Sequence, residues 1–181
     1  MVRSFSALLE VRPGFTDPER ILTFRIPVPW SDVGDNEEVV ERFRQLRERV
    51  AAVAGVESVG LTSSATMDGW DSNDSTRVED FPTPANVLPP SRRYKWVSPE
   101  YFEAMGNPVV AGRAFTWDDI HARAPVALIT RNLALEYWST PAEAVGKRLR
   151  ENPASPWRTV VGVVGDVHDD GPPGRCGVLA Q

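Results

Sequence analysis

Three side chains near the end of the sequence could bind a metal ion. Asp166, His168 and Asp170 alternate along a predicted strand, so all three lie on one face of it. Mixed imidazole and carboxylate ligands suit several divalent ions, and a bound ion could activate water in a metal-dependent hydrolase. An exposed strand end or turn explains the same cluster equally well. The only candidates for further ligands are His121 and the pair Asp118-Asp119. The hydrolase therefore stays as an alternative.

Other patterns that usually carry chemistry are incomplete. Gly146-Lys147 resembles part of a phosphate-binding loop, but Pro141 and Arg148 occupy positions that the motif reserves for glycine and for serine or threonine. Ser63-Ser64 lacks the flanking glycines of a nucleophile elbow. We therefore predict no catalytic, cofactor-binding or metal-binding residue and no cofactor, and we expect the protein not to be an enzyme.

The composition limits the classes of partner. The chain has 181 residues, a formal net charge of -5 and a pI of about 5.1, and its 20 basic residues are scattered, so nucleic acid is not expected as a partner. The single cysteine, Cys176, permits no internal disulfide. The longest apolar runs, residues 126–129 and 160–164, are far shorter than the roughly 20 residues that span a bilayer. The first residues lack a signal-peptide pattern, so we expect export to depend on sequence outside this chain.

Residues 97–119 predict a structural corner, not a reaction centre. Ser98 suits a helix N-cap and Pro99 the first helical turn, which predicts a short helix over residues 100–105. Gly106 can end this helix in a left-handed conformation. The aromatic side chains of the corner indicate packing. For Trp70, Phe81, Trp96 and Trp117 we expect a core or hinge role, with a surface for a partner as the alternative.

A first strand–helix–strand unit is predicted over residues 21–62. Alternating apolar residues predict a half-buried strand at 21–28, and a second strand follows at 56–62. Between them, residues 35–54 predict the clearest helix, with a capping box at its start. Its apolar positions form one stripe, and we expect burial of this stripe against the sheet to dominate stability. The stripe consists of Val39, Phe43, Leu46, Val50 and Val53.

The opposite side of this helix is charged. It carries Arg42, Arg44, Arg47, Glu48 and Arg49. A charged helix face of this kind is usually solvated, so no partner is expected for it.

A second strand–helix–strand unit is predicted after a polar insertion. Residues 63–91 are rich in polar residues and proline, which predicts a long loop with a short strand near 77–79. Residues 125–130 then predict a buried strand, residues 131–138 a helix and residues 157–167 a strand. Gly162 and Gly165 predict a bend in the last strand or a close approach to another backbone.

Several ordered motifs resemble the MacB-like periplasmic core domain of ABC-transporter permeases. The central stretch, VSPEYFEAMGNPVVAGRAFTWDD, matches the family's order of a strand, an "SP-x-YF" helix, a "GR-x-F" segment and an acidic pair. The pieces "SF-x-x-LL", "LTF", "GV-x-x-VG", "VALIT", "VGKRL" and "VVGVVGDV" also fit. The resemblance covers residues 4–170, nearly the whole chain.

This resemblance implies a fold and a function. The fold is expected to be α+β, with two strand–helix–strand units forming a porter-like subdomain and a small β-rich subdomain inserted between them. The function implied is that of a non-catalytic extracytoplasmic domain of a MacB/FtsX-class permease, of the duplicated type, at the periplasmic side of the cell membrane. The implied partners are transmembrane helices of the same permease, indirectly a cytoplasmic ATPase subunit, and a periplasmic partner. A free-standing adaptor or binding module remains the other alternative.

The resemblance also implies a domain division. We predict a juxtamembrane-like segment at 1–20, a porter-like subdomain at 21–62 and 125–170, an inserted subdomain with the connecting corner at 63–124, and an irregular tail at 171–181. The tail departs from the family pattern, so we expect truncation or a shifted reading frame there.

Overall fold

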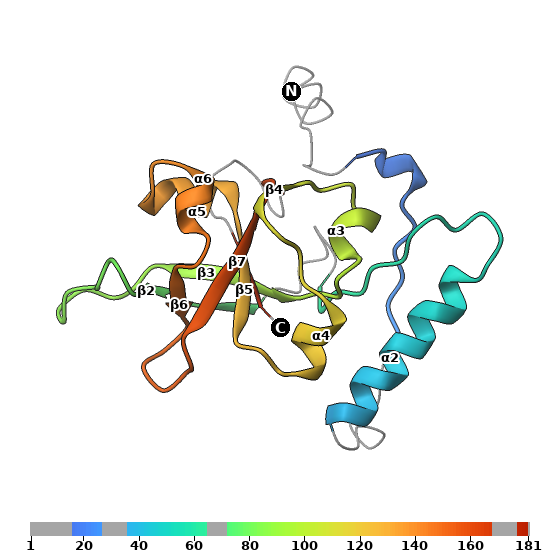
Figure 1. The fold of residues 1–181 in the computed structure, drawn as a ribbon, viewed down its shortest axis with the longest axis horizontal. Coiled ribbons are helices and arrows are strands. Elements are labelled where there is room, and N and C mark those ends of the chain that lie inside the picture. Colours follow the sequence, from blue (N-terminus) through green and yellow to red (C-terminus); the bar gives the residue numbers. More distant parts are fainter. Residues whose placement is uncertain (1–15, 27–35, 65–71, 168–176, 181) are drawn as a thin grey trace, which may run out of the picture.

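A mixed β-sheet with short helices on both faces forms the centre of the protein. The computed structural model describes residues 16–26, 36–64, 72–167 and 177–180. Eight strands make up the sheet (Figure 1). They are β1 (Ser72–Ser75), β2 (Arg77–Val78), β3 (Ser91–Trp96), β4 (Val109–Gly112), β5 (Val126–Thr130), β6 (Arg148–Arg150), β7 (Arg158–Val164) and β8 (Gly177–Ala180). The mixed α/β class expected from the sequence is confirmed.

The strand order shows that the sheet curls back on itself. The order is β1-β3-β8-β5-β7-β6-β2. Strand β4 lies off this path and pairs with residues 162–164 of β7. The first and last strands of this path, β1 and β2, are separated in the chain by Thr76 alone. One bent segment therefore pairs with β3 at one end and with β6 at the other. The buried hydroxyls of Thr76 and Tyr94 lie 3.0 Å apart at this bend.

The helices lie on both sides of the sheet, and one stands apart. They are η1 (Pro18–Arg20), α2 (Asn36–Ala51), α3 (Tyr101–Ala104), α4 (Trp117–His121), α5 (Arg131–Tyr137) and α6 (Pro141–Ala144). Figure 1 shows α5 and α6 on one side of β5 and β7, α3 and α4 on the other, and α2 at the edge of the molecule. In the described residues, no helix is both long and apolar enough to cross a membrane.

The core consists of two apolar clusters, one on each face of β5. All five residues of β5 are buried, as expected for a strand that is covered on both sides. Ala127 and Ile129 pack with Leu133 of α5 and with Ala144 of α6. Val126 and Leu128 point the other way and pack with the corner around α3, including Tyr101, Phe102 and Phe115. The alternation of a strand thus places neighbouring residues in different clusters.

Glycine allows β4 and β7 to approach closely. A Cβ atom on Gly162 would lie 2.3 Å from the carbonyl oxygen of Arg113, which is backbone and cannot swing away. Gly112, on the facing strand, has φ +71° and would meet the carbonyl oxygen of Val161 at the same distance. The expected close approach at Gly162 is confirmed, and Gly165 makes a similar one against Asn107.

The second strand–helix–strand unit is confirmed. β5 and β7 run parallel to each other, and α5 and α6 lie in the connection between them. The predicted strand near residues 77–79 is β2. The short helix predicted within the corner is α3, and Gly106 lies just after it with φ +62°. Ser98 does not cap α3, because its hydroxyl accepts a hydrogen bond from the backbone N–H of Leu61 at 3.0 Å.

The first strand–helix–strand unit differs from the prediction. Helix α2 forms, but residues 21–26 and 56–62 contain no strand, apart from one bridge between Thr62 and Val97. Leu22 is 84% exposed and Phe24 is 62% exposed. The alternating pattern fits a strand, but a strand also needs a partner, and none pairs with residues 21–26 in the described chain. Residues 27–35, with the predicted capping residue, lie outside the described residues.

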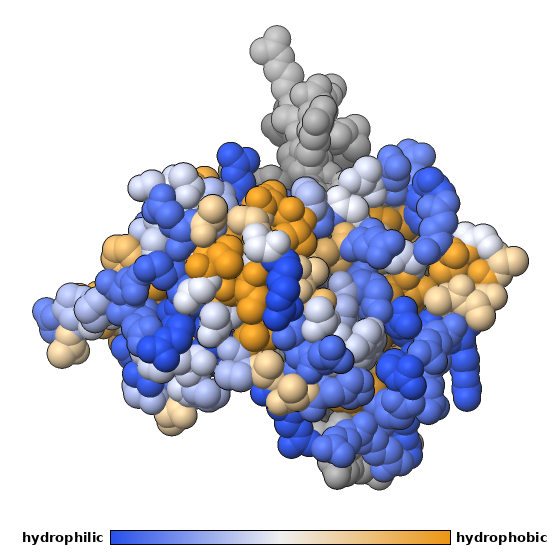
Figure 2. All heavy atoms as spheres, in the orientation of Figure 1, coloured by the Kyte–Doolittle hydropathy of each residue, from blue (hydrophilic) through white to orange (hydrophobic). Residues whose placement is uncertain are grey.

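The apolar stripe of α2 is not the main source of burial. The first four stripe residues are only half-buried, and Val53 is 58% exposed. Figure 2 shows an apolar area over the turn after α2, where Val53 and Val56 are both exposed. The expectation that this stripe dominates stability is wrong, because the largest fully buried apolar side chains belong to β3, β5, β6, β7 and α5.

The end of the chain is not wholly irregular. Gly177–Ala180 forms β8, which pairs in parallel with β3 and antiparallel with β5. The prediction of an irregular tail at 171–181 is wrong for these four residues. Their backbone forms ladder hydrogen bonds with β3 on one side and with β5 on the other. Strands β1 to β3 join the same sheet as β5 and β7, so pairing crosses the predicted boundary at residues 124 and 125. The domain boundaries themselves stay a prediction.

Candidate functional site

A polar contact joins α2 to the corner that carries α3 and α4. Glu100 is the N-cap residue of α3, and Trp117 is the first residue of α4. The Oε1 atom of Glu100 lies 3.2 Å from Nη1 of Arg47 on α2 and accepts a hydrogen bond from Trp117 Nε1 at 2.8 Å. The guanidinium of Arg47 also lies 5.8 Å from the centre of the Trp117 ring. We call these three residues the α2 junction.

The α2 junction is partly shielded from water. The side chains of Arg47 and Glu100 are 19% and 22% exposed, which is much less than for the other charged pairs of α2. The second oxygen of Glu100 and the Nε atom of Arg47 are buried without a hydrogen-bond partner in the structure. Electrostatic attraction at such a place is stronger than at an open surface. We therefore expect each of the few contacts of the α2 junction to contribute to the stability of α2 packing against the corner.

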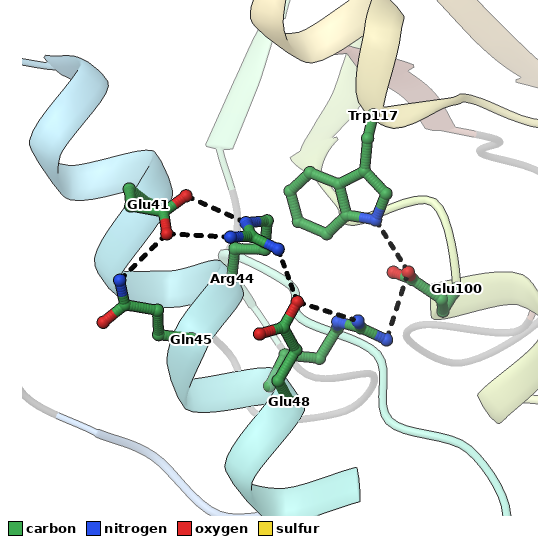
Figure 3. Close-up of polar contacts among 7 residues, drawn as sticks. Glu41, Arg44, Gln45, Glu48, Glu100 and Trp117 are labelled. Carbon is green, nitrogen blue, oxygen red and sulfur yellow. Dashed lines mark hydrogen bonds and ion pairs between the residues drawn. The ribbon is translucent and has the colours of Figure 1, made fainter.

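A ladder of charged side chains leads from the solvent face of α2 to the α2 junction (Figure 3). Glu41 accepts hydrogen bonds from Arg44 at 2.8 and 2.9 Å and from Gln45 at 2.9 Å. Arg44 also contacts Glu48 at 2.5 Å, and Glu48 lies 4.0 Å from Arg47. The hydrogen bond from Arg44 lowers the pKa of Glu41 to about 2. These charges order the face of α2 that meets the corner.

The start of α2 makes a second ionic contact with the same corner. Glu37 lies 3.5 Å from Arg123, which follows α4. Both side chains are well exposed, so this pair is weak and screened by salt. Charged groups of α2 thus contact the corner at two places, Glu37 with Arg123 and Arg47 with Glu100.

The corner itself is rigid around Asp119. Arg113 donates to both carboxylate oxygens of Asp119, at 2.6 and 2.9 Å. Thr116 and Asp119 form a reciprocal capping box at the start of α4. The hydrogen bond from Arg113 lowers the pKa of the Asp119 carboxyl to about 2. Of the acidic pair in this corner, Asp119 thus holds the backbone at the start of α4.

The residues considered for metal binding are placed only in part. Asp166 accepts a hydrogen bond at 2.8 Å from the backbone N–H of Asn132, near the start of α5. This contact satisfies one of the free N–H groups that begin a helix. His168 and Asp170 lie outside the described residues. Across the described ranges there is no group of three or more histidine, cysteine, aspartate or glutamate side chains arranged to hold a metal ion.

Gly146-Lys147 has a structural role in the turn before β6. Gly146 has φ +85° and donates its N–H to the carbonyl of Val160. The Lys147 ammonium lies 2.5 Å from the carboxylate of Asp80. The turn thus joins the β6 region to β7 and to the residues that follow β2.

The sequence indicated Trp117 but not the partners of Arg47. Arg47 falls on the charged face of α2, which predicts a solvated side chain. One signal was available, since Arg47 directly follows Leu46 at the edge of the apolar stripe. A long side chain at that edge can lay its stem along the protein and carry its charge inward. The sequence did not indicate a role for Glu100, because its partners Arg47 and Trp117 are distant from it in the sequence.

The chain is similar in fold to solved domains of transporter proteins. The fold is similar to that of the periplasmic region of MacB from Actinobacillus actinomycetemcomitans, at 17% identity and a TM-score of 0.53. The alignment covers 76% of this chain and 53% of that structure. The extracellular domain of YknZ, a noncanonic ABC-type transporter from Gram-positive bacteria, aligns at 15% identity over 75% of this chain and 60% of that one, with a TM-score of 0.49. None of the curated proteins compared matches the chain.

The family model of the MacB-like periplasmic core domain matches residues 1–175. The chain belongs to this family, as the sequence motifs predicted, and is a periplasmic core domain of the MacB/FtsX-like ABC-transporter permease class. It spans 53% to 60% of the length of the solved structures described above.

Proposed function

We propose that this chain is the non-catalytic extracytoplasmic part of a permease and passes on movement of the membrane helices. The α2 junction carries the proposal, since it joins α2, which lies at the edge of the molecule, to the corner with α3 and α4 through a small set of polar contacts. Interfaces of this kind between parts of one chain are more polar than a core, and relative motion is the default expectation for them. A fully apolar contact would resist such motion.

In this proposal the rest of the permease supplies the anchor and the energy. Transmembrane helices of the same permease hold the domain at the outer side of the cell membrane, and a cytoplasmic ATPase drives those helices. The domain then changes the angle between α2 and the sheet and presents a different surface to a periplasmic partner or substrate. Family membership supports this assignment, and the two-part arrangement of α2 and sheet suits a hinge.

The proposal is tested by locking the α2 junction in a complete permease that contains this domain. Cys176 is replaced by serine, and cysteines are introduced by Arg47→Cys and Glu100→Cys. A bifunctional maleimide with a cleavable disulfide spacer then joins the two positions. We expect the locked permease to lose transport driven by ATP, and cleavage of the spacer by a reductant to restore it. The same double variant before cross-linking is the matched control. Normal transport by the locked protein would contradict the proposal.

A further inference from the structure

Two arginines face each other on the neighbouring strands β2 and β6. Arg77 of β2 lies directly opposite Arg150 of β6 in the antiparallel register. In the described part of the chain, neither guanidinium forms an ion pair with a carboxylate, and the Nε atoms of both are buried without a hydrogen-bond partner. Like charges directly opposite across two strands destabilise a sheet. The pair thus concentrates positive charge at a cost to stability.

The neighbouring charges do not neutralise this pair, because they are already engaged. Glu79 binds Arg148 through both carboxylate oxygens, Asp80 binds Lys147, and Glu151 binds Arg158 at 3.0 Å. Each of these carboxylates faces its own cation across a neighbouring strand or turn. Hydrophilic side chains cover the end of the molecule where β2 and β6 lie (Figure 2).

Trp157 fixes the orientation of one member of the pair. The guanidinium carbon of Arg150 lies 4.3 Å from the centre of the Trp157 ring, as in a cation–π contact. Its Nη1 atom donates to the carbonyl of Pro153 at 2.9 Å. A guanidinium that is already held in place loses little freedom when it binds a ligand. Arg77 and Arg150 are both half-buried, so the outer part of each fork is open to solvent.

A planar guanidinium fork matches the geometry of a carboxylate or a phosphate. Attachment to a lipid surface calls for about four to eight clustered basic residues, whereas this site offers two. The protein as a whole carries a net charge of -5, which repels an anionic membrane. We propose that Arg77, Arg150 and Trp157 form a recognition site for an acidic segment of a partner protein, with one carboxylate bound between the two guanidinium groups.

This proposal goes beyond the movement of α2 and can fail separately. It concerns binding by the isolated chain, whereas the proposed function concerns transport by the whole permease. A failure to bind the acidic probe would therefore not contradict the proposed movement of α2, and a failure of the transport test would not contradict the binding site.

The probe is a blocked tetraglutamate peptide titrated into the isotopically labelled chain at low ionic strength. We expect the side-chain NMR signals of Arg77, Arg150 and the Trp157 indole to shift together in a saturable way. Arg77→Gln should weaken the affinity by about tenfold or more, because a charge-assisted hydrogen bond is lost. Arg77→Lys should recover only part of it, since lysine lacks the fork.

The matched control is Arg131→Gln, which removes an exposed arginine at the start of α5. It should leave the affinity unchanged, and unchanged NMR spectra away from the substituted site show that each variant is folded. Equal weakening by Arg77→Gln and Arg131→Gln would overturn the proposal, since binding would then follow overall charge. Binding to vesicles with anionic lipid that depends on Arg77, without binding to the peptide, would also overturn it.

Discussion

Glu100 is the residue on which the α2 junction depends, because one of its oxygens contacts both Arg47 and Trp117. A single carboxylate therefore connects α2 with the starts of two short helices. Its position at the N-cap of α3 places the negative charge near the positive end of a helical turn. Loss of this charge removes the ion pair and leaves the Arg47 guanidinium partly buried without a counterion.

We predict that Glu100→Gln destabilises the packing of α2 by about 1–2 kcal/mol, since a partly buried ion pair is broken. The matched control is Glu38→Gln, which breaks an exposed pair with Arg42 on the same helix and should cost only about 0.5 kcal/mol or less. Hydrogen exchange of the α2 amides measures both changes. Equal effects of the two substitutions would show that the α2 junction has no special role.

Asp119 makes the corner sensitive to acid. Its pKa is lowered from 3.8 to about 2, first by the hydrogen bond from Arg113, so the unfolded chain binds a proton more readily than the folded one. The stabilisation from this carboxylate is therefore present above pH 3.8 and is lost as the pH falls toward 2. We predict that Asp119→Asn reduces the decrease in melting temperature across this window.

The reduction is expected to be partial, because the lowered pKa of Glu41 acts in the same direction. Arg113→Met removes the donor and should flatten the pH dependence in the same way as Asp119→Asn. Circular dichroism melts from about pH 2 to pH 5 measure the slope. An undiminished slope in both variants would mean that this ion pair does not stabilise the folded state.

The sequence of α2 explains why a helix forms there, but not how the helix packs on the rest of the protein. Its apolar spacing predicts the helix, but α2 ends at Ala51, before the predicted end at residue 54, and Gly55 with φ +89° lies in the turn that follows. The same spacing does not tell how fully the stripe is covered, because that depends on which other segments pack against it. The prediction of a strand on each side of α2 is wrong for the same reason, because the spacing of apolar residues does not show which segments pair. In contrast, β5 is buried on both faces and was identified from five consecutive residues.

We predict that α2 opens more readily than the sheet. Its stripe is half-buried, whereas β5 and β7 contain several residues with no exposed surface. Local opening requires less energy where fewer apolar side chains are covered. Native-state hydrogen exchange should show α2 amides exchanging well before those of β5, in a step that does not unfold the sheet. Equal protection of α2 and β5 would contradict the account of α2 as a separate part.

At the scale of the whole molecule, β8 connects distant parts of the chain. It lies between β3 and β5, so the sheet joins the last described residues to strands from the middle of the chain. Its short apolar sequence, Val178-Leu179, gave little signal at the sequence level. Likewise, the closure of the sheet at Thr76 depends on pairing between residues that are far apart in sequence, such as Arg77 and Arg150. Periodicity predicts elements, but not such long-range partners.

We predict that Leu179→Pro destabilises the sheet by about 3 kcal/mol, because proline removes a backbone donor from the inside of a ladder. Leu179 pairs with Lys95 on one side and with Leu128 on the other. Leu88→Pro is the matched control, since Leu88 is 90% exposed in the loop before β3, and it should have little effect. Urea denaturation followed by circular dichroism compares the two variants. Equal stability would mean that β8 does not hold the sheet together.

Relative movement of α2 and the sheet is the central claim for the molecule as a whole. It is measured most directly by the distance between spin labels at Arg49 of α2 and Arg131 of α5, both of which are exposed. The measurement uses a complete permease with this domain and its ATPase, with Cys176 replaced by serine. We predict that the distance distribution shifts between the ATP-bound and nucleotide-free states, and that the shift disappears when the α2 junction is cross-linked. One distribution, identical in both states, would contradict the account.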